Sequence, residues 1–153
     1  MEEQLAIQDF YQVPYRCCFG CGPDNAQGWH IKSFVHGNLV VASFRPNEKL
    51  TGGIPAFAYG GMLAAIADCH GNAAAAWFYH QRQGLQLGQA PLARTVSANL
   101  AVNYKKPTPM GIDLHLEAKL LSIEGRKVKV AITISANNDC CCVAELLAVA
   151  VKA

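Results

Sequence analysis

Charged side chains are scarce in this chain of 153 residues, where aspartate, glutamate, lysine and arginine together make up 16%. Because a free-standing domain usually carries about 25% charged residues, we expect another subunit to cover part of the surface. A strong basic excess is also missing, because 13 basic and 11 acidic residues give a net charge of only +2, so nothing indicates a nucleic-acid partner. The composition predicts a homo-oligomeric globular protein.

Long uninterrupted hydrophobic stretches are also missing. None approaches the roughly 18 residues of a membrane-spanning helix. The N-terminus, Met1-Glu2-Glu3-Gln4, is acidic and lacks the basic and apolar regions of a signal peptide. We therefore expect a cytoplasmic protein with no membrane partner.

The seven cysteines do not follow the pattern of a disulfide framework. Their number is odd, and residues 140–142 are consecutive cysteines whose side chains would alternate between the faces of a strand. Cys18 and Cys21 form one C-x-x-C, but no second pair or histidine cluster at zinc spacing completes it. We expect no metal and no resident cofactor, and we interpret these cysteines as packing the loop 17–28.

The length is that of a single domain, residues 1–153, with residues 1–28 as an N-terminal extension. A short helix is predicted within residues 2–10, and a turn-rich loop follows it. The pair Gly37-Asn38 is a hairpin signal between two predicted strands, 31–36 and 39–44.

A long helix is predicted over about 58–80, because alanines and large apolar residues occur almost all round it. The rest of the chain alternates apolar and polar residues with a period of two, which is typical of strands. Turn signals separate these strands, which we place at about 95–104, 113–120, 127–134 and 141–151. One buried helix and one antiparallel sheet satisfy this order only if the sheet curls around the helix. The sequence thus predicts an α+β hotdog fold.

The start of this helix carries the most informative residues. Gly60 and Gly61 offer unpaired backbone N–H groups that no side chain shields and that favour negative charge. Asp68 is a carboxylate among alanines, where an ionised group is unfavourable without a partner or a task. An oxyanion-binding helix end with a base or nucleophile indicates acyl chemistry.

Gly61 and Asp68 lie on a similar face of the helix, because seven residues make nearly two turns. At a rise of about 1.5 Å per residue they are on the order of 10 Å apart along the axis. One carbonyl group cannot contact both. If both act on one substrate they must come from different subunits, with two such helices packed antiparallel.

These residues resemble the PaaI-like acyl-CoA thioesterases of the hotdog superfamily. In that family a His-Gly-Gly opens the helix and an acidic residue follows nine positions after the histidine. Here Tyr59, Gly60, Gly61 and Asp68 stand at those positions, with tyrosine in place of the usual histidine. The resemblance covers about residues 18–152 and has further matching features: a loop at 18–25, Thr95-Val96-Ser97 leading to Tyr104-Lys105-Lys106-Pro107, and Gly125-Arg126.

The resemblance implies hydrolysis of an acyl-CoA or acyl-carrier-protein thioester at an active site that lies in a dimer interface. The protein would be a homodimer or a homotetramer made of two dimers, with coenzyme A as part of the substrate. Asp68 would activate a water or attack the carbonyl carbon itself, and Gly60 and Gly61 would bind the oxyanion. Other residues are candidates for substrate binding: Tyr59 as a pocket wall, and Thr95 and Ser97 as hydrogen-bonding groups. Five basic residues are candidate ligands of the coenzyme A phosphates: Arg94, Lys105, Lys106, Arg126 and Lys127.

Two other functions remain open at this point. Tyr59 in place of histidine slightly favours a non-catalytic module that binds acyl-CoA or another small ligand, whereas the retained Asp68 argues against it. A hotdog dehydratase of hydroxyacyl thioesters would need a histidine base. The side chain of His70 is about 200° from that of Asp68 around the helix axis, so we expect His70 to be a packed residue.

Overall fold

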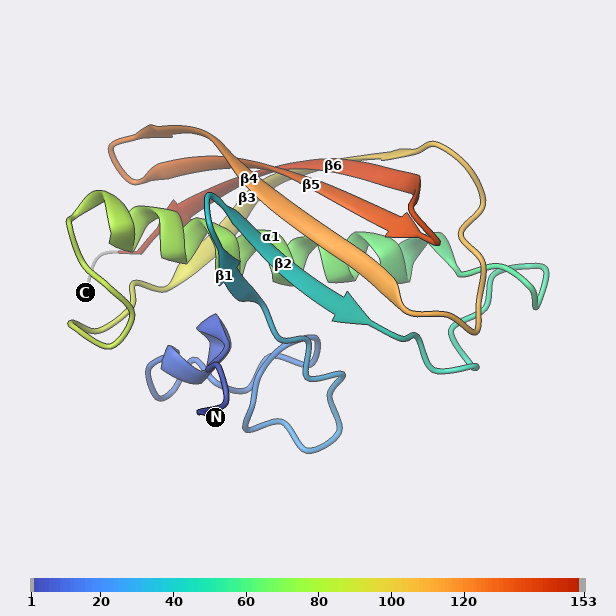
Figure 1. Ribbon diagram of the computed structural model, residues 1–153, viewed down its shortest axis with the longest axis horizontal. Helices are drawn as coiled ribbons and strands as arrows, with labels where there is room; N and C mark the ends of the chain where they lie inside the picture. The colour runs from blue at the N-terminus through green and yellow to red at the C-terminus, as the bar shows by residue number, and fades with distance from the viewer. Residues whose placement is uncertain (1, 152–153) are drawn as a thin grey trace.

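The computed structural model describes residues 2–151, and Figure 1 shows one long helix lying along a sheet that curves around it. The helix, α1, spans Gly60–Arg82. The strands are β1 (Phe34–His36), β2 (Leu39–Phe44), β3 (Thr95–Tyr104), β4 (Leu114–Glu124), β5 (Lys127–Ala136) and β6 (Asp139–Ala150). They form one six-stranded antiparallel sheet in the order β1-β2-β4-β5-β6-β3, which confirms the predicted hotdog fold.

The core lies between α1 and the concave face of the sheet. Every second residue of β5 is buried, and large apolar side chains of α1 such as Met62 and Ile66 pack against this face. At Gly71 a Cβ atom would lie 2.8 Å from Leu146 Cδ2 and 3.0 Å from Ile132 Cδ1. The missing side chain therefore lets the middle of α1 approach β5 and β6 closely.

Between Gly61 and Phe78 one stripe of α1 stays partly exposed, while the other residues of this stretch are buried. The stripe follows helical spacing and consists of Gly61, Ala64, Ala65, Asp68 and Asn72. It runs beside β3, which is an edge strand of the sheet. The expectation that Gly61 and Asp68 share a face is thus confirmed.

Tight turns join the strands where the sequence predicts them. Asn137 and Asn138, between β5 and β6, have φ angles of 50° and 65°, as a type I′ hairpin turn requires. Gly125, between β4 and β5, has a φ of 60°. The register of each hairpin shifts once, between Leu120 and Ser122 in the β4–β5 pair and between Ile134 and Ser135 in the β5–β6 pair.

The alternation predicted for β3 is interrupted by a bulge. Ser97 pairs with Ala148 and Asn99 pairs with Leu147, so Ala98 is an extra residue without its own partner. A bulge of this kind reverses the side-chain alternation of a strand beyond it. Ser97 therefore faces α1 together with the later residues Leu100 and Val102, whereas strict alternation would place them on opposite faces.

The prediction for the N-terminal segment is partly wrong. Within residues 2–10 only the 3₁₀ turn η1 (Ile7–Phe10) is helical, and the segment is not confined to the outside, because Ile7 and Gln8 are buried. Strand β1 starts at residue 34 rather than 31. The backbone of Ser33 is already used, since its N–H donates to Gln8 Oε1 at 2.8 Å and its carbonyl accepts from the Ile7 N–H at 2.8 Å.

The remaining boundaries differ by a few residues. The helix begins and ends two residues later than predicted. It begins later because Ala58 is held in an extended segment, where its N–H donates to the Thr108 carbonyl at 2.8 Å. Among the described residues no helix is long and apolar enough to cross a membrane.

Candidate active site

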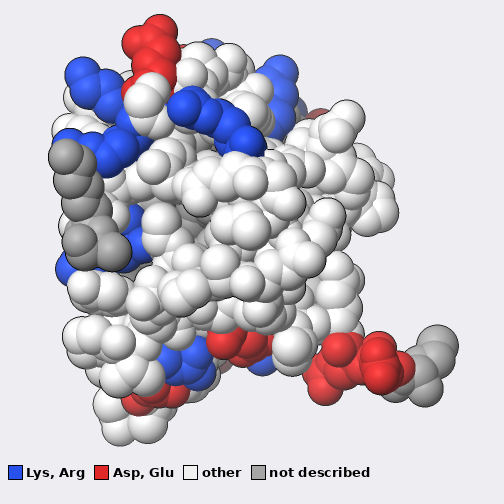
Figure 2. Space-filling model, turned by 90° about the vertical axis from the view of Figure 1, so that its left-hand side faces the viewer, with Lys and Arg blue, Asp and Glu red and all other residues white. Residues whose placement is uncertain are grey.

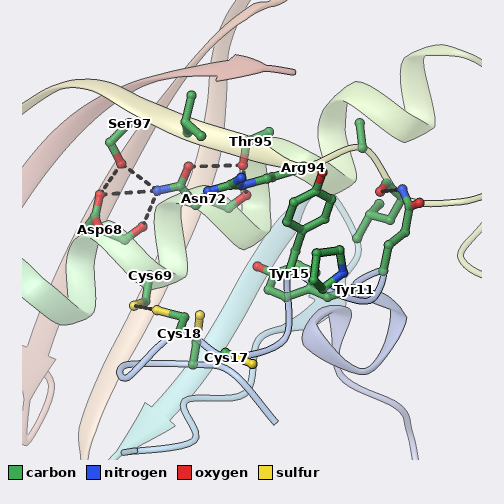
Figure 3. A pocket seen from close by; sticks show the side chains of 16 residues that line it. Tyr11, Tyr15, Cys17, Cys18, Asp68, Cys69, Asn72, Arg94, Thr95 and Ser97 are labelled. Atoms are coloured by element: carbon green, nitrogen blue, oxygen red, sulfur yellow. Dashed lines mark hydrogen bonds between the residues drawn. The ribbon is translucent and has the colours of Figure 1, made fainter. Parts of the chain in front are cut away.

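A cavity of about 590 Å³ opens between the N-terminal segment, α1 and the start of β3 (Figure 3). Polar and ionisable groups from all three elements line it, among them Tyr15, Cys18, Asp68, Asn72, Arg94 and Ser97. The N-terminal segment lies below β1 and β2 in Figure 1 and forms one wall of the cavity. Segments far apart in the sequence therefore meet around Asp68.

Asp68 is held by two hydrogen-bond donors. The Ser97 hydroxyl donates to Asp68 Oδ1 in a short contact, and Asn72 Nδ2 donates to the same oxygen at 3.2 Å. Asn72 Nδ2 also lies 2.7 Å from Ser97 Oγ, so the three side chains form a closed cluster (Figure 3). Among the described residues Asp68 Oδ2 accepts no hydrogen bond, which leaves this oxygen available to a water or a substrate.

Thr95 fixes the orientation of Asn72. Its hydroxyl lies 3.0 Å from both Asn72 Oδ1 and the Asn72 backbone carbonyl. Because the amide oxygen is thereby directed toward the hydroxyl, the amide nitrogen is directed toward Asp68. The bulge in β3 allows Thr95 and Ser97 to serve this cluster while Leu100 and Val102 of the same strand pack toward the core.

The residues that begin α1 form a second group. Tyr104 donates its hydroxyl to the Gly60 carbonyl at 2.8 Å and so connects the end of β3 to the start of the helix. The exposed ring of Tyr59 lies over Gly61, because a Cβ at position 61 would lie 2.6 Å from its ring atoms. Within the described chain the backbone N–H groups of Gly60 and Gly61 have no hydrogen-bond acceptor.

This second group does not border the cavity of Asp68. Tyr59, Gly60 and Gly61 are not among the described residues that line it. Seven helical residues place Gly61 about 10 Å from Asp68 along the axis. Within a single chain, the carboxylate and the helix start that are expected to act on one carbonyl are therefore too far apart to do so.

Three of the candidate phosphate ligands, Lys105, Lys106 and Arg126, also lie apart within one chain. Lys105 and Lys106 follow the end of β3, where Lys106 pairs with Asp139 at 3.4 Å. Arg126 donates to the carbonyl of Ala150, which is the register partner of the first residue of β3. The ten residues of β3 separate these two positions by about 30 Å.

Figure 2, which faces the left-hand side of Figure 1, shows where the basic side chains gather. Most lysines and arginines on this face lie toward the top, at the level of the β4–β5 turn, and a broad part of the face carries no charge. Nearer to Asp68, Arg94 lines the cavity itself, with its guanidinium carbon 4.7 Å from the centre of the Tyr15 ring. This cation–π contact places a positive charge at the wall of the cavity.

His70 is a buried, neutral residue of the core. Its Nδ1 lies 2.8 Å from Ser33 Oγ and its Nε2 lies 2.9 Å from the Val40 carbonyl, so both ring nitrogens have partners. Burial lowers the pKa of His70 to about 4. The expectation of a packed histidine is confirmed.

A cluster of three thiols borders the cavity next to Asp68. Cys18 and Cys21 of the N-terminal loop meet Cys69 of α1, and the Sγ atoms of Cys18 and Cys69 are 3.8 Å apart (Figure 3). Hydrogen bonds from Cys21 and Cys69 lower the pKa of Cys18 to about 2, whereas the pKa of Cys21 is raised to about 12 by its bond to Cys18. The pKa of Cys69 is raised as well, first by its bond to Cys18. Of the three thiols, Cys18 therefore ionises most readily.

Residues 56–142 match the sequence profile of a family described as the thioesterase superfamily. The chain belongs to the thioesterase superfamily. Within this family it is 30% identical over 113 residues to the acyl-coenzyme A thioesterase THEM4 of Xenopus laevis. That match covers 74% of this chain and 45% of the relative, so the chain spans less than half of the length of that protein.

Two solved structures agree with the fold. A crystal structure of a superfamily protein from Shewanella loihica PV-4 has a TM-score of 0.66 and 33% sequence identity, covering 84% of this chain and 96% of that one. The PaaI protein of E. coli, with a TM-score of 0.64 and 13% identity over 81% of each chain, shares the fold.

The contacts of three residues at the site were not predicted from the sequence. Asn72 stands four positions after Asp68, a spacing that places both on one helix face and was available as a signal. Tyr104 belonged to the Tyr-x-x-Pro match, but its bond to Gly60 is a long-range contact. Cys69 is 51 positions from Cys18, and nothing in local spacing joins them.

Proposed function

We propose that this protein hydrolyses acyl-CoA or acyl-carrier-protein thioesters, with Asp68 as the general base or the nucleophile. The observation that carries the proposal is the cluster of Asp68, Asn72 and Ser97. It holds one carboxylate oxygen in place and leaves the other open to the cavity. In one route Asp68 takes a proton from a water that attacks the thioester carbon; in the other Asp68 attacks that carbon and gives a mixed anhydride.

The carbonyl oxygen of the substrate would be bound at the start of α1. Gly60 and Gly61 supply backbone N–H groups without acceptors, at the helix end that favours negative charge. Because Asp68 of the same chain is about 10 Å away along the helix, we assign the carboxylate to a second subunit. The active site would then lie at a dimer interface.

Three features of the chain support a dimer with this geometry. Strand β3 is an edge strand whose outer side pairs with no other described strand. The stripe of α1 beside it is partly exposed, and charged residues are scarce in the chain. Twofold symmetry requires that two copies of β3 pair antiparallel, so the two α1 helices would also run antiparallel. Asp68 of one chain would approach Gly60 and Gly61 of its partner.

The same pairing would bring the basic residues together. The end of β3, with Lys105 and Lys106, would lie beside the start of the partner's β3, near which Arg126 is located. Cations from two chains would then be available to the phosphates of coenzyme A. Tyr59 would form a wall of this composite pocket.

The free state of all seven cysteines supports a reducing, cytoplasmic location.

The first test is release of free thiol from a panel of acyl-CoA and acyl-carrier-protein thioesters by wild type and Asp68→Ala. We expect turnover of at least one thioester by wild type and its loss in the variant. Asp113→Ala is a matched control, because Asp113 is an exposed carboxylate that pairs with the exposed Arg45. Equal turnover by wild type and Asp68→Ala would refute the assignment of Asp68.

The dimer-interface site can be tested by mixing two inactive variants. Asp68→Ala and Gly61→Val subunits, co-expressed with different tags, should form heterodimers in which one of the two sites is complete. Random pairing would restore about a quarter of the wild-type activity. A site within one chain would give no restoration. Light scattering on the purified protein reports whether dimers or tetramers form.

A non-catalytic module that binds acyl-CoA is the second candidate, favoured by Tyr59 at the position of the usual histidine. Tight binding of an acyl-CoA without thiol release from any member of the panel would support it. The dehydratase is disfavoured, because His70 is buried with both ring nitrogens bonded and cannot reach a substrate.

A further inference from the structure

The three thiols beside Asp68 are arranged as a ligand set. We propose that Cys18, Cys21 and Cys69 together bind one thiophilic divalent cation of the zinc type, which joins the N-terminal loop to α1. This inference is independent of the thioesterase activity. It replaces the expectation of no metal, which rested on Cys18 and Cys21 alone.

The distances fit such an ion. The three Sγ atoms lie within 4.8 Å of one another, and those of Cys18 and Cys69 are 3.8 Å apart. With zinc–sulfur bonds of about 2.3 Å, two sulfurs of a tetrahedral site are separated by about 3.8 Å. A disulfide needs sulfurs at about 2.05 Å, and it would leave the third thiol without a partner.

The loop is built to bring these sulfurs together. A Cβ atom at Gly20 would lie 2.3 Å from Cys69 Sγ, so any other residue at this position would displace the sulfur of α1 from the loop. The Gly22 N–H donates to the Cys18 carbonyl at 2.8 Å, which closes the turn between Cys18 and Cys21. The Ile31 N–H donates to the Gly20 carbonyl at 3.0 Å and fixes the loop further.

The fourth coordination position would face the cavity. All three cysteines line that cavity, together with Asp68. Three protein ligands and one open position leave room for a water or another exogenous ligand. Because Cys69 directly follows Asp68 in α1, the ion would also fix the wall of the cavity next to the carboxylate.

Cobalt and zinc are suitable probes. The full chain, reduced with a phosphine and desalted without oxygen, is titrated with Co²⁺ and monitored by thiolate-to-cobalt absorption. We expect saturation at one ion per chain, displacement of cobalt by zinc, and a rise of several degrees in the melting temperature with zinc. Cys18→Ser and Cys69→Ser should lose the absorption or weaken binding at least tenfold.

Cys17→Ser is the matched control, because Cys17 is an exposed cysteine next to Cys18 in the same loop. It should bind cobalt as wild type does. No uptake by the reduced wild type, or an absorption that survives Cys18→Ser and Cys69→Ser unchanged, would overturn the proposal. Circular dichroism of each apo variant verifies that it is folded, and Cys18→Ser, an exposed position, is the substitution least disruptive to the core.

Discussion

The amide nitrogen of Asn72 lies 3.2 Å from Asp68 Oδ1, one helical turn away on α1. Thr95 holds the other end of this amide at 3.0 Å, so the nitrogen has a fixed direction. Asn72 is therefore a positioning residue, which sets the orientation of the carboxylate without contact to the reacting atoms in the proposed mechanism.

Asp68→Asn should abolish most of the hydrolysis while the protein remains folded. The amide cannot act as a base or as a nucleophile, and general-base catalysis contributes about 10²–10⁴-fold. We expect a loss of kcat of this size for the best thioester, with a melting temperature within a few degrees of wild type. Wild-type kcat in the variant would remove Asp68 from the mechanism.

Asn72→Asp should shift the pH profile of kcat/KM. A second carboxylate beside Asp68 would disfavour ionisation of the pair, so the pKa of the base and the acid limb of the profile would move to higher pH. Asn72→Ala is the comparison, since it removes the same hydrogen bond without adding charge. Loss of one donor to the carboxylate should lower kcat and move the acid limb by less than the added charge does. Identical profiles for the two variants would contradict the positioning role.

Gly61→Ala tests the proposed oxyanion site. The new Cβ would lie 2.6 Å from ring atoms of Tyr59, which must swing away. Because Tyr59 is 47% exposed, its side chain has room to move aside, and we expect little change in the free energy of unfolding. Crowding at the N–H group should lower kcat/KM by up to about 100-fold. Gly53→Ala, at a position with open space, is the control and should behave as wild type.

His70 should make the stability depend on pH. Burial lowers its pKa from 6.5 to about 4, so between these values the unfolded chain binds a proton that the folded protein does not. The free energy of unfolding should therefore fall as the pH is lowered through this window, by up to about 3 kcal/mol. Urea denaturation at pH 7, 5 and 4 measures this effect. His70→Gln should show a flatter dependence, and parallel curves for the two proteins would exclude His70 as the cause.

Much of the fold was accessible from the sequence because its signals are local. The period of two in β4 and β5, the turn residues Asn137 and Asn138, and the alanine-rich pattern of α1 each depend on near neighbours. The same holds for the candidate pair of Gly61 and Asp68, whose shared face follows from helical spacing. The N-terminal segment was predicted less well, because Gln8 and Ser33 are joined by contacts across the chain.

By itself the sequence determined the order of helix and strands, the glycine-started helix and the position of its single carboxylate, because these depend on periodicity and turn chemistry over a few residues. Only the tertiary structure decided which side chains hold Asp68 and which thiols meet. The bulge at Ala98 directs Ser97 toward Asp68, and the folding of the N-terminal loop onto α1 brings Cys18 to Cys69 across 51 positions. Such contacts arise from packing between distant segments, which no local pattern records.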